Sequence, residues 1–285
     1  MAALVIARLT IAESIRRRIL WVLLGLTAFS VTLTTWGVER LVSLARENGT
    51  GEVQIFIGVS QTLVLIAFMF SFVLAMTAAF LGAPAIAADV ESGVAHAMLA
   101  RPIRRADLVV GRWLGLAVVV IAYAAASGLL EIATIRLVSG YAPPNPLESV
   151  VYLSAQAIVL MTVALLLGTR LPAMASGAIC VVLFGLGWMA GVFAGVGRLL
   201  DAGPLVSVAD ASRWILPTDG LWRGAIHALQ PPLVVLVAAG RLGSAADANP
   251  FFATNAPEPA FLAWSIVWTV IVLGLAALSL DRRDL

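Results

Sequence analysis

Few of the side chains that usually carry out chemistry are present, and they are spread thinly over the 285 residues. Cys180 is the single cysteine and lies within an apolar run, so we expect a small buried side chain there and no intrachain disulfide. His96 and His227 have no cluster of Cys, His, Asp or Glu at ligand spacing, so a metal site has no support. Both histidines fall in segments that we expect to be loops, so no apolar run holds a nucleophile–base pair. An intramembrane enzyme is therefore an alternative and not the main hypothesis.

The chain has 18 basic residues apart from histidine, and all of them are arginine. A P-loop needs a lysine to reach the terminal phosphates of a bound nucleotide, and Schiff-base chemistry also needs a lysine amine. This chain therefore contains neither. We expect it to bind no cofactor itself, so if ATP drives the protein, the ATP and Mg²⁺ belong to a partner chain.

The elements that position these residues follow from a very apolar composition. Hydrophobic residues make up 61% of the chain and charged residues 12%, and the mean hydropathy is +1.00. A soluble domain carries roughly 25% charged residues. Here the charges collect between long apolar runs, as a bilayer requires, because an ionised side chain at mid-depth costs at least ~2.5 kcal/mol. The sequence predicts an all-α integral membrane protein.

Six apolar runs reach the ~20 residues that a helix needs to cross a bilayer. We predict one transmembrane domain over residues 1–285, with spans at 19–38, 56–83, 113–135, 150–169, 172–197 and 259–280. The first run follows three arginines like a signal peptide, but it is too long and has no small-residue cleavage site, so we interpret it as a retained span.

A long connection, residues 198–258, separates the last two spans. It contains a further apolar run at 231–240, which is too short to cross a bilayer and suits a re-entrant or surface-lying helix. Leu216 to Leu221 in this connection include Pro217-Thr218-Asp219, which we interpret as a helix-capping turn.

Arginine placement predicts the orientation. With the N-terminus inside, eleven of the 18 arginines lie in inner segments and seven in outer segments, and the inner loops are the short ones. The positive-inside rule therefore favours cytoplasmic N- and C-termini.

The connection after the second span, residues 84–112, is the most informative segment. Its central part, residues 89–105, suits a short helix at the membrane surface, with acidic residues and Ser92 at its start and Pro102 at its end. Arg104 and Arg105 would then anchor the next span at the lipid headgroups. The alternative is an ordinary positive-inside loop.

This connection resembles the cytoplasmic signature of type-2 ABC exporter permeases, specifically their NosY-like branch. The matching positions are Glu91-Ser92-Gly93, Leu99-Ala100-Arg101-Pro102, Arg105 and Gly111-Arg112. Val94 and Arg112 depart from the family's usual threonine and lysine. The basic end of the N-terminal segment, the Leu216–Leu221 stretch and the C-terminal Arg282-Arg283-Asp284-Leu285 agree with the family as well, so the resemblance covers essentially the whole chain.

The resemblance implies a non-catalytic permease subunit in the plasma membrane of a prokaryotic cell. Two copies of a separate ABC ATPase and a second permease chain, identical or related, would be its partners, together with the lipid bilayer; no nucleic acid is expected. The short loop helix would be the coupling helix that docks on the ATPase. The residues expected to contribute to that docking are Glu91, Gly93, Arg101, Pro102, Arg104 and Arg105.

Residues 1–18 would be the family's connecting helix, lying along the inner membrane face. At helical spacing Thr10, Glu13 and Ser14 share a polar arc, while Ile6 and Arg8 fall on the wrong sides of such an amphipathic helix.

Gly187, Gly191 and Gly195 recur every fourth residue in the fifth span. Such a stripe lets helices approach closely. It would either pack within the subunit or form the interface between two permease chains.

Glu131 is an acid inside the third predicted span. An intramembrane acid is a functional candidate, but this one is shallow enough to reach headgroups or to pair with Arg136. A second alternative to the permease hypothesis is a secondary transporter, which would place ionisable residues at the bilayer midplane. Glu131 is the single candidate for such a residue, so the support for this alternative is weak. The apolar spans suit a lipid-like or hydrophobic cargo, and the sequence identifies the cargo no further.

Overall fold

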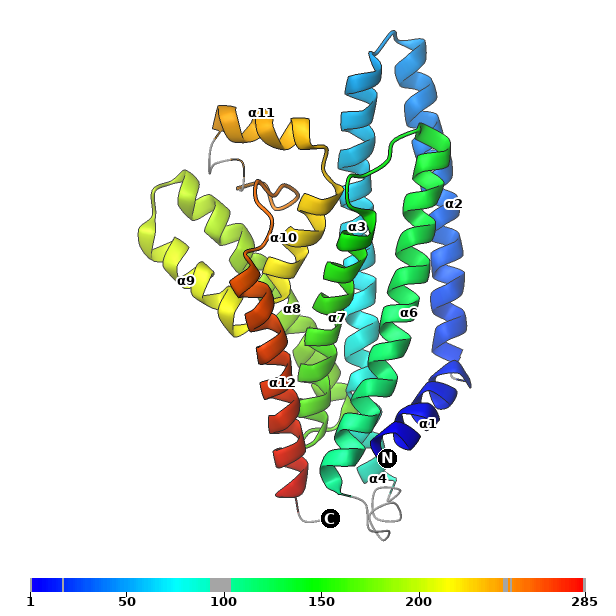
Figure 1. Cartoon of the computed structure of the whole chain (residues 1–285), viewed down its shortest axis with the longest axis vertical. Helices are drawn as coiled ribbons and strands as arrows, with labels where there is room; N and C mark the ends of the chain where they lie inside the picture. The colour runs from blue at the N-terminus through cyan, green and yellow to red at the C-terminus, as the bar shows by residue number, and fades with distance from the viewer. Residues whose placement is uncertain (1, 17, 93–103, 243–245, 247, 284–285) are drawn as a thin grey trace.

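The computed structural model describes residues 2–16, 18–92, 104–242, 246 and 248–283, which form a bundle of long helices without strands (Figure 1). The helices in chain order are α1 (Ala2–Arg16), α2 (Arg18–Glu47), α3 (Glu52–Gly82), α4 (Pro84–Glu91), α6 (Arg105–Ser139), α7 (Pro146–Gly168), α8 (Ala173–Leu199), α9 (Gly203–Ile215), α10 (Thr218–Leu229), α11 (Pro232–Leu242) and α12 (Pro259–Asp281).

Six helices of the described chain are long and apolar enough to cross a membrane: α2, α3, α6, α7, α8 and α12. The prediction of an all-α protein with about six spans is confirmed. Helices are the expected solution because a bilayer core offers no water to bond an exposed backbone, and a helix satisfies its own N–H and C=O groups.

Several helices are longer than the spans predicted from hydropathy. Helix α2 continues to Glu47, past the apolar run 19–38, and α3 begins at Glu52, before the run 56–83. The two helices meet in a tight hairpin at the turn that contains Gly49. Gly49 adopts a φ of 73°, the left-handed conformation that glycine tolerates at a helix end. Hydropathy marks where a helix meets lipid, whereas the helix itself continues until a residue such as Gly49 ends it.

The centre of the bundle is α7, the most buried of the six spans. It approaches α3 closely because small residues face each other: a Cβ atom on Gly82 would lie 2.7 Å from the carbonyl oxygen of Met161. One buried polar side chain also lies at this contact. Gln156 of α7 accepts a hydrogen bond from the Ser71 hydroxyl (2.7 Å) and donates one to the carbonyl oxygen of Thr218 (3.2 Å). This amide therefore joins α3, α7 and the start of α10.

The predicted connection 198–258 is largely helical and contains α9, α10 and α11. A bend of 114° separates α10 from α11, so the pair does not make one straight span. At ~1.5 Å per residue, α11 is about half the ~30 Å thickness of a bilayer core. Its re-entrant or surface-lying placement stays a prediction.

Candidate functional site

The predicted coupling residues that the structure describes lie at one end of the bundle. We call this end the terminal face; it consists of α1, α4, the first turns of α6 and the last turn of α12 (Figure 1). Glu91, in the last turn of α4, and Arg104, just before α6, are both exposed there. Gly93, Arg101 and Pro102 lie outside the described residues.

A buried arginine, Arg112 of α6, joins three elements of the terminal face. Its Nη1 donates to Glu13 Oε2 of α1 at 2.6 Å, and its Nη2 donates to Asp89 Oδ2 of α4 at 2.6 Å. The Arg112 side chain is only 10% exposed and Asp89 only 14%, so little water screens their ion pair. Arg112 thus holds α4 and α1 against α6.

Asp89, Glu91 and Ser92 were expected at the start of a short helix. The structure describes them at the end of one, and residues 93–103, through which the expected helix would run, lie outside the described residues. Asp89 and Glu91 lie in the last turn of α4, and Ser92 caps the C-terminal end of that helix through its backbone N–H. A carboxylate near a helix C-terminus is electrostatically unfavourable, and the guanidinium of Arg112 offsets this for Asp89. From the sequence, Arg112 could be placed only within a motif, because its partners at positions 13 and 89 are remote along the chain.

The helix α1 lies directly against α6, and two glycines make this possible. A Cβ atom on Gly111 would lie 2.7 Å from the carbonyl oxygen of Ala3, and one on Gly115 would lie 2.7 Å from that of Ala7. The buried face of α1 contains Thr10 along with small and apolar residues. Its polar arc therefore faces α6, and the burial of Ile6 beside Thr10 explains why Ile6 did not fit a helix lying flat on a membrane.

Replacing Gly111 with leucine is expected to push α1 away from α6, because the added side chain would overlap Ala3 and Ile6. Overpacking of this kind typically costs about 1–3 kcal/mol, which makes opening of α1 roughly tenfold more frequent. Tryptic cleavage after Arg8, monitored by mass spectrometry, should accelerate by that factor. The matched control is Gly25→Leu in α2, where an added Cβ meets no atom within 4 Å. Equal cleavage rates in the two variants would contradict the close contact.

The other flank of residues 93–103 is attached to the end of α12. Arg105 Nη1 donates hydrogen bonds to the carbonyl oxygens of Leu280 (3.0 Å), Asp281 (2.9 Å) and Arg283 (2.7 Å). A guanidinium there adds hydrogen-bond donors to the carbonyl groups at the end of the helix and complements the helix dipole. Arg105 was expected at the lipid headgroups, and its partners are instead protein carbonyls.

Two glycines of the stripe on α8, Gly187 and Gly191, face the first turn of α10. A Cβ atom on Gly187 would lie 2.9 Å from Thr218 Oγ1, and one on Gly191 would overlap the carboxylate of Asp219. Gly195 is buried on the same helix. Gly187 and Gly191 therefore provide the space in which α10 packs against α8 within this chain.

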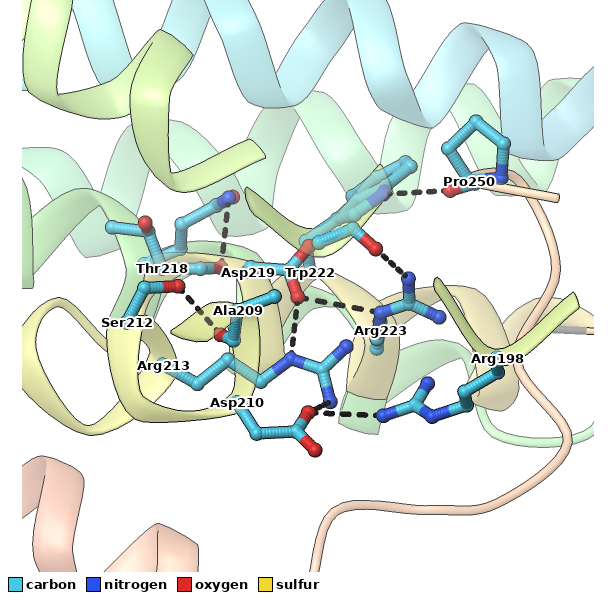
Figure 2. Close-up of polar contacts among 12 residues, drawn as sticks. Arg198, Ala209, Asp210, Ser212, Arg213, Thr218, Asp219, Trp222, Arg223 and Pro250 are labelled. Atoms are coloured by element: carbon cyan, nitrogen blue, oxygen red, sulfur yellow. Dashed lines mark hydrogen bonds and ion pairs between the residues drawn. The ribbon is translucent and has the colours of Figure 1, made fainter. Parts of the chain in front are cut away.

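The predicted capping turn Pro217-Thr218-Asp219 does begin α10, although no side chain caps it, and Asp219 is also the centre of a charged cluster (Figure 2). Its Oδ2 accepts hydrogen bonds from Arg213 Nε (2.9 Å) and Arg223 Nε (3.3 Å). Arg213 also pairs with Asp210, which in turn pairs with Arg198 of α8. Since Asp219 is only 4% exposed, these contacts hold α8, α9 and α10 together.

The family model described as ABC-2 family transporter protein matches residues 4–285, which is nearly the whole chain. No curated protein matches the chain. The family match agrees with the six apolar helices of the described chain, and it agrees with the absence from the sequence of any lysine that a P-loop would need. The chain therefore belongs to the ABC-2 family and is the multi-pass membrane component, the permease, of an ABC transporter.

Proposed function

We propose that this chain works with two copies of a separate ABC ATPase subunit and with a second permease chain, identical or related. ATP and Mg²⁺ bind to the ATPase, and residues 93–103 with their flanks receive its movement. The assembly lies in the plasma membrane of a prokaryotic cell and belongs to the NosY-like branch of the family. Its cargo is unidentified.

The observation that carries this proposal is that both described flanks of residues 93–103 are bound to other helices. On one side α4 is bound through Asp89 to Arg112, and on the other Arg105 is bound to the end of α12. A push on this segment would therefore move α6 and α12 directly, and α1 through Glu13. A mobile surface loop without such attachments would transmit little movement to the spans.

The two ends of the described chain lie at the same end of the bundle, which supports placing both of them on the same side of the membrane. The first and last described helices begin and end at the terminal face, which also carries both flanks of residues 93–103 (Figure 1). A positive-inside arrangement then puts this face in the cytoplasm, where an ATPase would find its ATP.

The test is to reverse a charge at the proposed docking surface. The tagged chain is purified from native membranes, and bound ATPase is quantified by labelling with photoreactive azido-ATP. We expect a labelled subunit with the unaltered chain and roughly tenfold less with Glu91→Arg, because an unfavourable charge in an interface weakens binding. Glu39→Arg, an exposed acid of α2, is the matched control and should keep the subunit.

The alternatives, a secondary transporter and an intramembrane enzyme, both act without an ATPase. If no labelled subunit accompanies the unaltered chain, they replace the proposal. If the subunit binds equally well to the Glu91→Arg variant, the docking surface lies elsewhere.

A further inference from the structure

A cavity of about 340 Å³ lies between α2, α3, α6 and α7. Most of its wall is apolar, with Phe70 and Leu153 among the lining residues. One row of hydroxyl groups crosses this wall, because Thr27 Oγ1 lies 3.0 Å from Tyr123 Oη and 3.2 Å from Ser127 Oγ. On one side the cavity is lined by α2, which is the least buried of the six candidate spans.

Glu131 is the single acid among the residues that line this cavity, and none of them carries a positive charge. In the described part of the chain Glu131 does not pair with Arg136, which was one of the two roles expected of it. Glu131 is 9% exposed, whereas Arg136 is exposed. Five residues correspond to a rotation of ~500° along an α-helix, so the two side chains point about 140° apart.

The carboxyl group of Glu131 is only partly satisfied by the described chain. Thr34 of α2 interacts with it, but the buried Oε1 has no hydrogen-bond partner among the described residues. A buried polar atom without a partner is costly, and the cost is greater for a charged group in an apolar wall. The arrangement is therefore complementary to a ligand that brings a positive charge and hydrogen-bond donors.

We propose that this cavity binds a small hydrophobic amine in its protonated form. The ammonium group lies against Glu131 and the apolar body fills the space lined by the surrounding side chains. The volume lies at the lower end of the ~300–1,000 Å³ that is typical of ligand pockets, which restricts the ligand to small molecules. Binding needs only this chain, so it can be measured without an ATPase and does not depend on the proposed function.

The test uses three probes that differ in one group: 4-phenylbutylamine, 4-phenylbutanol and 4-phenylbutanoate. Their binding to the chain in phosphatidylcholine nanodiscs is measured by calorimetry, with empty nanodiscs subtracted to remove partitioning into lipid. We expect the amine to bind at least tenfold more tightly than the alcohol, since a hydrogen bond between two charged groups is stronger than one to a neutral group. The anionic acid should bind most weakly of the three.

Glu131→Gln should remove the preference for the amine and leave the binding of the alcohol unchanged. Glu39→Gln, which changes an exposed acid of α2, should retain the preference. Ser30→Leu is an independent second variant, because it fills the cavity from α2 and leaves the Glu131 carboxyl group in place, and it should weaken the amine and the alcohol together. The proposal is overturned if the amine binds Glu131→Gln as tightly as the unaltered chain, or if Ser30→Leu leaves amine binding intact.

Discussion

Arg112→Leu is expected to lower the free energy of unfolding by about 3 kcal/mol. Removing one partner of a buried ion pair costs about 3–5 kcal/mol because the other charge stays buried without compensation. The lower end applies here, since Glu13 is 43% exposed and water screens its half of the network, whereas Asp89 is only 14% exposed. Unfolding of the purified chain by SDS titration measures the change.

The matched control for this variant is Arg136→Leu, which removes an exposed arginine from the far end of the same helix. It should change the stability by no more than about 0.5 kcal/mol. A second comparison isolates the ion pair. The double variant Asp89→Leu/Arg112→Leu should be more stable than Arg112→Leu alone, because it also removes the buried carboxylate that has lost its Arg112 partner. If the double variant is less stable than the single one, Asp89 does not depend on Arg112.

Gly191→Ala is expected to destabilise the chain by about 3 kcal/mol, although alanine is normally the better helix residue. The added methyl group would overlap the carboxylate of Asp219, which has no free space to move because Arg213 and Arg223 both bind it. Overpacking costs about 1–3 kcal/mol, and a displaced Asp219 would lose part of its ion pairing as well. The same SDS titration measures the effect.

Gly185→Ala provides a matched control on the same helix. No atom lies within 4 Å of the position of its added Cβ, so this variant should be stabilised by about 0.5–1 kcal/mol through helix propensity alone. Gly187→Ala should fall between the two, since its Cβ would meet the Thr218 hydroxyl at 2.9 Å. If Gly191→Ala matched Gly185→Ala in stability, α10 would not pack against this part of α8.

The two destabilising variants concern residues for which sequence reasoning gave a motif but no partner. The stripe of Gly187 and Gly191 indicated a close helix contact, yet its neighbour could be another helix of this chain or a second chain. A glycine spacing reports only that a helix surface is flat. The identity of the opposing residues, Thr218 and Asp219, depends on how α10 folds back onto α8.

The sequence likewise identified two acidic residues as candidates but not the residues that surround them. Asp89 and Glu131 were each assigned a local role, as a helix cap and as an interfacial acid, because local rules use only the nearest neighbours along the chain. The structure gives both of them environments built from remote segments. Asp89 meets Arg112 from α6, and Glu131 lines a cavity to which α2 contributes Thr34.

The sequence by itself determined the protein class, the six apolar spans and the lack of a P-loop. These are properties of composition and of local runs, and a bilayer leaves an apolar run few alternatives to a helix. Only the tertiary structure decided the helix ends beyond the membrane, the packing of α1 on Gly111 and Gly115, and the partners of Arg112, Asp219 and Glu131. These depend on which helix faces meet, and hydropathy along one chain contains no information about contacts between residues as far apart as 13 and 112.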